Sequence, residues 1–331
     1  MFSTASIGIA YSSPDCQSPE DYLRDSDIAM YRAKALGKAR SEIFDTSMHA
    51  RAMHLLELET DLRHAVERNE IEVWYQPIVD LITRKIIGFE GLARWNSPTR
   101  GIMPPMEFIP IAEETGLIVP IGLSVLRSSC RQLRLWQDEF RSPDLSISVN
   151  LSIRQFMQPD LVEQIAEILE TNRLKPSHLR LEITESVVIG DLSAAERILN
   201  RIRDLGIKVC LDDFGTGYSS LSYLIRLPID TLKIDRSFIR GIAAGHEHSD
   251  VVDTIIRLAK NLDLNVVAEG VETSEQLNQL CALKCDQAQG FLFSKPVESG
   301  IATEMLKSFA FPEEAKENQL RLVRGAGAES S

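Results

Sequence analysis

Acidic and amide residues recur at the ends of short apolar segments along this chain. The segments are rich in Val, Ile and Leu, as strands buried on both faces are. Helix-length stretches separate most neighbouring segments, which is the spacing of repeated strand–helix units. Because parallel strands end at one rim, the pattern predicts a (β/α)8 barrel with these residues on its active-site face. In chain order the residues are Glu90, Asn150, Glu182, Asp212, Asp213, Lys233, Asp235, Glu269 and Gln289.

So many carboxylates at one rim indicate a metal site. Like charges at close range force protonation or drive side chains apart, unless cations neutralise them. Oxygen ligands with almost no Cys or His select Mg²⁺, Mn²⁺ or Ca²⁺ over zinc or copper. Taken alone, each acid is better explained as a solvated loop residue or a helix N-cap than as a metal ligand. The series at matching strand ends is what favours the metal.

Composition limits the possible partners. The 331 residues suffice for a barrel, typically about 250 residues, and a smaller piece. A net charge of −12 argues against a protein that coats a nucleic acid polymer. Five cysteines fit reduced thiols, and Cys281 and Cys285 are expected to be buried. No apolar segment reaches the roughly 20 residues that span a bilayer. A cytoplasmic location is expected, although a longer parent chain could carry a membrane anchor.

The chain divides into four predicted parts. Residues 1–45 contain one expected strand, STASIGIAY, and one helix, PEDYLRDSDIAMYRAKALGKAR. Residues 46–69 have an apolar face at helical spacing and predict a linker helix. The barrel is expected over 70–310, and a polar tail that frays over 311–331.

The barrel is expected to depart from the regular fold at its start. EVWYQPIVD and KIIGFEGLARW are separated only by LITR, which is too short for a helical crossover. The pair predicts a hairpin, and therefore one strand antiparallel to the others. Helices are expected at about 106–115, 120–139, 155–172, 192–205, 218–226, 249–263 and 273–283.

Residues 70–310 resemble an EAL domain, the cyclic di-GMP phosphodiesterase family. The matching segments are YQPIVD, FEGLARW, GIMPPMEFIPIAEETGLIVPIG, SVNLS, LRLEITES, LDDFGTGYSSLSYL, LKIDRSFI, VVAEGVET and QAQGFLFSKP. Residues 1–45 resemble, through SDIAMYRAKALGKARSEIFD, the last strand and helix of a GGDEF-type diguanylate cyclase domain. The rest of that domain and any sensory domain would lie upstream in a longer parent chain. No GGDEF-like motif occurs here, so cyclase activity is not expected.

The resemblance implies two Mg²⁺ or Mn²⁺ ions at the rim, with Ca²⁺ as an inhibitor. A water between the ions would attack phosphorus in line with the leaving 3′-oxygen, converting cyclic di-GMP to linear pGpG. Relatives often dimerise, so a homodimer is expected. By motif, the ligands would be Glu90, Asn150, Glu182 and Asp212 for one ion, and Asp212, Asp213 and Glu269 for the other.

The resemblance also assigns catalytic roles. Lys233 would orient the attacking water and stabilise anionic charge, and Glu269 would assist deprotonation. Gln289 matches a glutamine near the water, with a structural amide as the alternative. Glu185 would anchor the mobile loop DFGTGYSSL, with an ordinary helix cap as the alternative.

Three residues are implied to contact the substrate. Arg94 would bind a phosphate, for which its planar fork is suited. Gln76 would contact a guanine, and Asp235 would also contact the substrate. His246 and His248 are better explained as exposed loop residues than as metal ligands, since no other soft ligand accompanies them.

Gly91 stands where the family has the alanine of its name. Glycine adds backbone freedom beside Glu90, worth about 0.5–1 kcal/mol in a strand, so normal or reduced activity is expected. The alternatives to an enzyme are a receptor that binds cyclic di-GMP without cutting it and an interaction scaffold with a vestigial site. The presence of every ligand, Lys233 and Glu185 favours the enzyme.

Overall fold

The computed structural model describes residues 4–11, 18–187, 192–215, 224–242 and 246–312. The chain divides into two compact units, Met1–Arg68 and Asn69–Ser331. Among the helices of the described residues, none has both the length and the apolar character needed to cross a membrane.

The first unit is built from two short strands and two helices. The strands β1 (Ile7–Ile9) and β2 (Ser41–Ile43) pair in parallel. The helix α1 (Pro19–Ala35) connects them and contacts α2 (Thr46–Glu67). Only one strand was predicted here. The prediction missed β2 because three residues are too few to show an alternating pattern.

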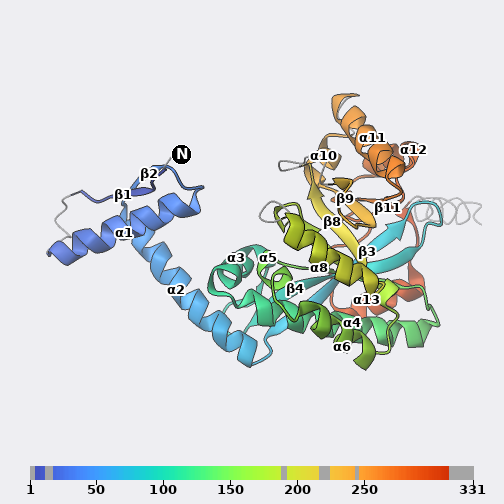
Figure 1. Ribbon diagram of the computed structural model, residues 1–331, viewed down its shortest axis with the longest axis horizontal. Helices are drawn as coiled ribbons and strands as arrows, with labels where there is room; N and C mark the ends of the chain where they lie inside the picture. The colour runs from blue at the N-terminus through green and yellow to red at the C-terminus, as the bar shows by residue number, and fades with distance from the viewer. Residues whose placement is uncertain (1–3, 12–17, 188–191, 216–223, 243–245, 313–331) are drawn as a thin grey trace, which may run out of the picture. The chain divides into compact units, whose positions relative to one another are not determined.

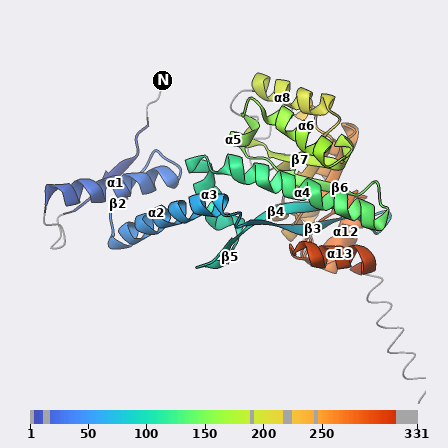
Figure 2. The same ribbon diagram turned by 90° about the horizontal axis from the view of Figure 1, so that it is seen from below.

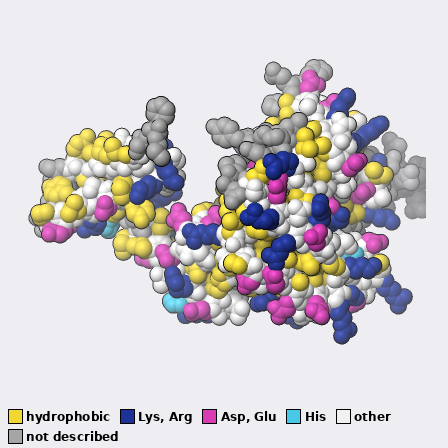
Figure 3. Space-filling view, in the orientation of Figure 1, with side chains coloured by type: hydrophobic (Ala, Val, Ile, Leu, Met, Phe, Trp, Pro, Cys, Tyr) yellow, Lys and Arg dark blue, Asp and Glu magenta, His cyan; other side chains and the backbone are white. Residues whose placement is uncertain are grey.

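Apolar side chains remain exposed on this first unit. Tyr11, Leu23 and Tyr31 are each about two-thirds exposed, and hydrophobic surface is prominent over the unit in Figure 3. The packing is nevertheless close where α1 crosses β1. A Cβ atom at Gly8 would lie 1.9 Å from the carbonyl oxygen of Ser26, so only glycine allows this approach.

The second unit is a closed ring of strands with helices on its outside (Figure 1). The sheet has nine strands, and pairing of β3 with β4 closes the ring and leaves β5 (Gly101–Met103) as an extension of β4. The predicted barrel is therefore confirmed. The ring strands are β3 (Ile71–Asp80), β4 (Ile86–Ser97), β6 (Ser146–Asn150), β7 (Leu179–Thr184), β8 (Lys208–Phe214), β9 (Thr231–Ile234), β10 (Asn265–Ala268) and β11 (Gln287–Ala288).

The direction of β3 sets it apart from the other ring strands. It runs antiparallel to both of its neighbours, β4 and β11, whereas the remaining ring pairs are parallel. The predicted hairpin and the single antiparallel strand are therefore confirmed. The parallel strands bring their carboxyl ends to one rim, as the sequence pattern requires.

The helices agree with the predictions except in four places. The helix expected over 155–172 is two helices, because Pro159 between them has no backbone N–H to continue the first. The helices α10 and α13 were not predicted, and most of the expected helix 218–226 lies outside the described residues. The helices are α3 (Pro105–Thr115), α4 (Ile118–Phe140), α5 (Ile153–Phe156), α6 (Leu161–Thr171), α8 (Leu192–Asp204), α10 (Arg236–Gly241), α11 (His246–Asn261), α12 (Ser274–Ala282) and α13 (Ser299–Ser308).

One smaller expectation is corrected. Cys281 is exposed on α12, whereas Cys285 just after the helix is buried as expected. Phe311, the first residue after the predicted barrel, is buried, and its ring lies 6.2 Å from the ring of Phe293. The rest of the expected tail, from 313, lies outside the described residues.

The long helix α4 lies along the outside of the ring and contacts β3, β4 and β6 (Figure 2). Trp136 anchors it: the indole ring lies 4.7 Å from the ring of Phe89 and 4.9 Å from that of Tyr75. The indole Nε1 also donates a hydrogen bond of 2.8 Å to Thr303 Oγ1 on α13. These contacts hold α4 closely against the strands that carry part of the predicted site.

Candidate active site

Most of the predicted site residues lie at or just after the carboxyl ends of the parallel ring strands. The parallel register places Asn150 beside Glu182, and Lys233 beside Val267 just before the end of β10. Glu90, near the middle of the longer strand β4, faces Ser148. Side chains alternate between the two faces of a strand, so each ligand needs an inward position in its own strand.

Lys233 occupies the centre of the site and is only 1% exposed. Its ammonium is surrounded by carboxylates from different strands. The distances from Nζ are 2.5 Å to Glu269, 2.7 Å to Glu182, 3.3 Å to Asp212 and 3.6 Å to Glu90. One positive charge therefore faces four potential negative charges. This imbalance favours a further cation at the site.

The protonation of the cluster reflects the same imbalance. Burial opposes the charge on Lys233, but the carboxylates together raise the pKa of its ammonium well above the usual value. Burial, followed by repulsion from Glu90, raises the pKa of Glu182 well above its usual value. Burial raises the pKa of Glu269 to about 8, against the attraction of Lys233. Without metal, the cluster therefore retains protons near neutral pH.

Glu90 is held by two amide donors. Its Oε1 accepts a hydrogen bond of 2.6 Å from Asn150 Nδ2, and its Oε2 accepts one of 2.6 Å from Gln289 Nε2. Burial acts to raise the pKa of Glu90, but the attraction of Lys233 and these hydrogen bonds lower it below its usual value. Glu90 therefore stays charged more readily than Glu182 and Glu269.

Two consecutive acids, Asp212 and Asp213, reach the same site despite the alternation of strand side chains. The backbone of Asp213 has a φ of 54°, in the left-handed region, and the pairing of β8 with β9 is irregular between Leu211 and Phe214. Carboxylate oxygens of Asp212, Asp213 and Glu269 all lie within 4.8 Å of one another. Such a set of hard oxygen donors fits a divalent cation of the Mg²⁺ or Mn²⁺ kind.

Glu185 fixes the segment that follows these acids. Its Oε1 accepts a hydrogen bond of 3.0 Å from the backbone N–H of Gly215. Gly215 has a φ of 95°, and a Cβ atom there would lie 2.8 Å from the ring of Phe238. Glycine is therefore needed at this position. The hydrogen bond is the contact expected of Glu185 as an anchor, although the loop residues 216–223 lie outside the described residues.

A family model for the EAL domain matches residues 59–296. This chain belongs to the EAL domain family. It is 44% identical over 307 residues to the bifunctional diguanylate cyclase/cyclic di-GMP phosphodiesterase MucR of Pseudomonas aeruginosa. It is 37% identical over 308 residues to the cyclic di-GMP phosphodiesterase NbdA of the same organism. The alignments cover 93% of this chain in both cases, but only 44% of MucR and 39% of NbdA.

A solved structure of the same fold contains the nucleotide. The PaMucR phosphodiesterase, in complex with c-di-GMP, is 45% identical to this chain and superimposes with a TM-score of 0.71. The match covers 74% of this chain and 99% of that one. The EAL resemblance predicted from the motifs is thus confirmed, while the GGDEF-type remnant stays a prediction.

Within this EAL domain, the residues predicted to bind substrate make different contacts. Arg94 lies beside the cluster on β4, with its guanidinium 5.4 Å from the ring of Trp74 and one N–H donated to the carbonyl of Ala93. Asp235 caps α10, accepting a hydrogen bond of 2.9 Å from Ser237 N. The structure therefore gives Asp235 a capping role, and its substrate contact stays a prediction.

Gln76 has a role that the sequence did not reveal. Its Oε1 accepts a hydrogen bond of 2.9 Å from Gln289 Nε2, and its own Nε2 donates one of 3.0 Å to the carbonyl of Ser294. Gln76 is 8% exposed and thus helps to orient Gln289, which in turn holds Glu90. The predicted guanine contact stays a prediction. No spacing pattern in the sequence predicts a hydrogen bond between two residues that lie 213 positions apart.

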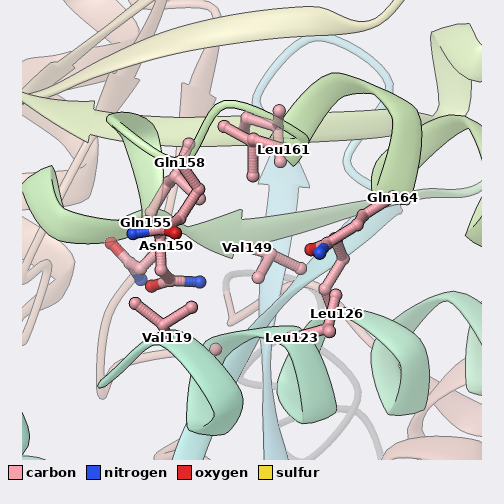
Figure 4. A pocket seen from close by; sticks show the side chains of 12 residues that line it. Val119, Leu123, Leu126, Val149, Asn150, Gln155, Gln158, Leu161 and Gln164 are labelled. Carbon is pink, nitrogen blue, oxygen red and sulfur yellow. The ribbon is translucent and has the colours of Figure 1, made fainter. Parts of the chain in front are cut away.

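His246 and His248 belong to the start of α11. The side chains of His246 and His248 are outside the described residues. A pocket lies between α4, α6 and the outer side of β6, where Asn150, Gln155 and Gln158 approach one another (Figure 4). A Cβ atom at Gly122 would lie 1.9 Å from Gln155 Nε2. Among the described residues no charged side chain lines this pocket, and Asn150 at its edge also donates a hydrogen bond to Glu90 in the acidic cluster.

Proposed function

We propose that this EAL domain is a metal-dependent phosphodiesterase that hydrolyses cyclic di-GMP to linear pGpG. The observation that carries the proposal is the buried contact of Lys233 with four carboxylates at the barrel rim. Cyclic di-GMP is proposed as the substrate because two relatives, MucR and NbdA, are named as cyclic di-GMP phosphodiesterases. The c-di-GMP complex of PaMucR supports the same substrate.

The residues of the site divide into two proposed sets of metal ligands. Asp212 belongs to both sets, because bridging by one carboxylate suits two ions about 3.5–4 Å apart. Mg²⁺ or Mn²⁺ is proposed because every donor is an oxygen. Ca²⁺ is proposed as an inhibitor, since it accepts a looser geometry. The first set is Glu90, Asn150, Glu182 and Asp212, and the second is Asp212, Asp213 and Glu269.

The metals would supply a water of lowered pKa and neutralise charge on the phosphoryl oxygens. Lys233, whose ammonium keeps its proton, would orient the attacking water oxygen and stabilise negative charge as it develops. Glu269 Oε1, 2.5 Å from Lys233 Nζ, would accept the proton from the water. An O–P bond forms from the water, and the P–O3′ bond breaks. The leaving 3′-oxygen takes up a proton, which gives a linear dinucleotide with a 5′-phosphate.

The remaining roles concern substrate binding and support. Arg94 would pair with a phosphate of cyclic di-GMP through its planar guanidinium. Gln289 would help to hold the attacking water, because its Oε1 is buried without a hydrogen-bond partner among the described residues. Gln76 and Asp235 are proposed to contact the substrate at the edge of the site, and Glu185 to anchor the backbone at Gly215.

The test is chromatography of cyclic di-GMP after incubation with the protein in Mg²⁺ or Mn²⁺, alongside Glu90→Ala. We expect linear pGpG from the wild type and intact substrate from the variant. Addition of Ca²⁺ should suppress product formation. Intact substrate with the wild type, together with binding in a titration, would instead identify a receptor, and absence of binding a scaffold.

The organisation of the longer protein is also a proposal. Because this chain spans less than half the length of MucR and NbdA, further domains are proposed to accompany it. We propose residues 1–45 as the end of a GGDEF-type domain, 46–69 as a linker helix and 70–310 as the phosphodiesterase. We further propose a homodimer in the cytoplasm. Size-exclusion chromatography with light scattering would test the dimer.

A further inference from the structure

Gly91 follows Glu90 in β4 and faces the opposite side of the strand. Glu90 points into the ring, so Gly91 faces outward, toward α4. A Cβ atom built on Gly91 would lie 2.5 Å from Ser129 Oγ and 3.3 Å from Val73 Cγ1. The first distance is shorter than any normal contact. An alanine at this position therefore cannot be added without movement of Ser129 or of the strand.

Ser129 lies on α4 and is completely buried. Its hydroxyl has no hydrogen-bond partner within the described part of the chain. A serine inside a helix commonly donates to the carbonyl four residues earlier, and a buried hydroxyl is unfavourable without such a bond. Hydrogen bonding therefore does not explain why a serine occupies this position. Its Oγ fills the space that a methyl group at Gly91 would take.

The position of Gly91 is also where this chain departs from the family motif, which has alanine there. We infer that Gly91 and Ser129 form a size-matched pair that sets the separation of β4 and α4 and thereby positions Glu90. The hydroxyl on the helix replaces the methyl group on the strand. Both are positioning residues, since neither reaches the interior of the ring. The inference rests on the proposed function to the extent that Glu90 is a metal ligand.

The surroundings of the pair explain why such a small change would reach the site. Trp136 holds α4 in place through its contacts with Phe89, Tyr75 and Thr303, so the helix cannot simply retreat. Movement of β4 would instead lengthen the two hydrogen bonds to Glu90, both 2.6 Å. Loss of a hydrogen bond that orients a metal ligand typically lowers metal affinity about 10–100-fold.

The test uses Gly91→Ala, Ser129→Ala and the double variant, with Ser128→Ala as a control on the exposed side of the same helix. Mn²⁺ affinity is measured without substrate, from the electron paramagnetic resonance signal of free Mn²⁺, and kcat and KM are measured separately. We expect Gly91→Ala to weaken Mn²⁺ binding about 10-fold and to lower kcat more than it raises KM. The double variant should return to within about 2-fold of the wild type, since alanine then fills the space left by the hydroxyl.

The outcomes separate this inference from the proposed function. If the wild type binds Mn²⁺ and Glu90→Ala does not, the proposed ligand role of Glu90 stands. Wild-type affinity in Gly91→Ala, or no recovery in the double variant, would then overturn the paired role of Gly91 and Ser129 alone. If the wild type does not bind Mn²⁺, both the proposed metal site and the inference are wrong. Recovery in the double variant also shows that the loss in Gly91→Ala is not general misfolding.

Discussion

The side-chain amide of Gln289 donates a hydrogen bond of 2.6 Å to Glu90 Oε2 and another of 2.9 Å to Gln76 Oε1. Both amide hydrogens of Gln289 are thus donated in hydrogen bonds, and Glu90 is held in one orientation. This arrangement connects β4, which carries Glu90, and β3, which carries Gln76, to the residue that directly follows β11. The position of Glu90 therefore depends on amides as well as on charge.

Replacement of Gln289 by Glu should weaken metal binding. The new carboxylate lacks the two N–H donors and brings a like charge beside Glu90, which raises the pKa of both acids. We expect Mn²⁺ affinity to fall about 10–100-fold, measured by titration without substrate. Gln279→Glu makes the same chemical change on the exposed side of α12 and should leave affinity unchanged. Equal affinity in Gln289→Glu and the wild type would refute the role of this hydrogen bond.

Lys233→Met should be strongly destabilising and nearly inactive. It leaves three buried carboxylates and the partly buried Glu269 without their cation, for which the expected loss in unfolding free energy is about 3–5 kcal/mol in metal-free protein. We expect kcat to fall about 10²–10³-fold. Urea denaturation and product chromatography measure the two effects.

Lys208→Met is the matched control for Lys233. Lys208 Nζ lies 2.6 Å from Asp230 Oδ1, but its side chain is 48% exposed. Exposed ion pairs contribute about 0–1 kcal/mol, so this variant should stay close to the wild type in stability. A Lys233→Met protein that is as stable as Lys208→Met would contradict the central role of the buried ammonium.

Glu185→Ala should reduce activity without removing a proposed metal ligand. The carboxylate accepts the N–H of Gly215, and its loss frees the backbone just after Asp213. We expect kcat/KM to fall about 10–100-fold, as for other residues that orient ligands. Glu185→Gln keeps an oxygen acceptor at the same reach and should lose less. If the two variants lose activity equally, the charge of Glu185 matters rather than this hydrogen bond.

The sequence predicts the site well where strand direction alone decides the answer. Parallel strands end at one rim, so the apolar segments before Glu182 and Asp212 were enough to bring those acids together. The direction of Asp213 was not predictable in this way, because it depends on a left-handed backbone at one residue. The contact of Gln76 with Gln289 and that of Gly91 with Ser129 also escaped prediction. Both depend on packing between distant elements, which local periodicity does not encode.

Metal binding should release protons at pH 7. Burial raises the pKa of Glu269 to about 8 and that of Glu182 well above its usual value, so these groups hold protons in the metal-free protein. A bound cation requires the charged carboxylates and displaces the protons. Mn²⁺ affinity should therefore rise as the pH increases toward about 8. Calorimetric titration in PIPES and in Tris should give different heats, because the buffer takes up the protons released on binding. Identical heats in the two buffers would show that the cluster is already fully charged.

A second pH effect should arise far from the cluster, at His178. Gln137 Nε2 lies 3.0 Å from His178 Nδ1 and donates to the carbonyl of Leu145 at 2.9 Å. The carbonyl requires a donor, so the amide nitrogen is the atom that faces the imidazole, and Nδ1 must accept. Burial, with a smaller effect of Lys175, lowers the pKa of His178 below 6.5.

Protonation of His178 is therefore less favourable in the folded protein than in the unfolded chain. Between the two pKa values the unfolded chain binds more protons, so stability is complete above pH 6.5 and is lost as the pH falls through that range. We expect the urea midpoint to decrease from pH 7.5 to pH 5.5, and to decrease less in His178→Phe, which cannot titrate. Because other groups titrate in both proteins, only the difference between the two slopes reports on His178. Parallel slopes would show that the bond between Gln137 and His178 does not determine the acid sensitivity of the barrel.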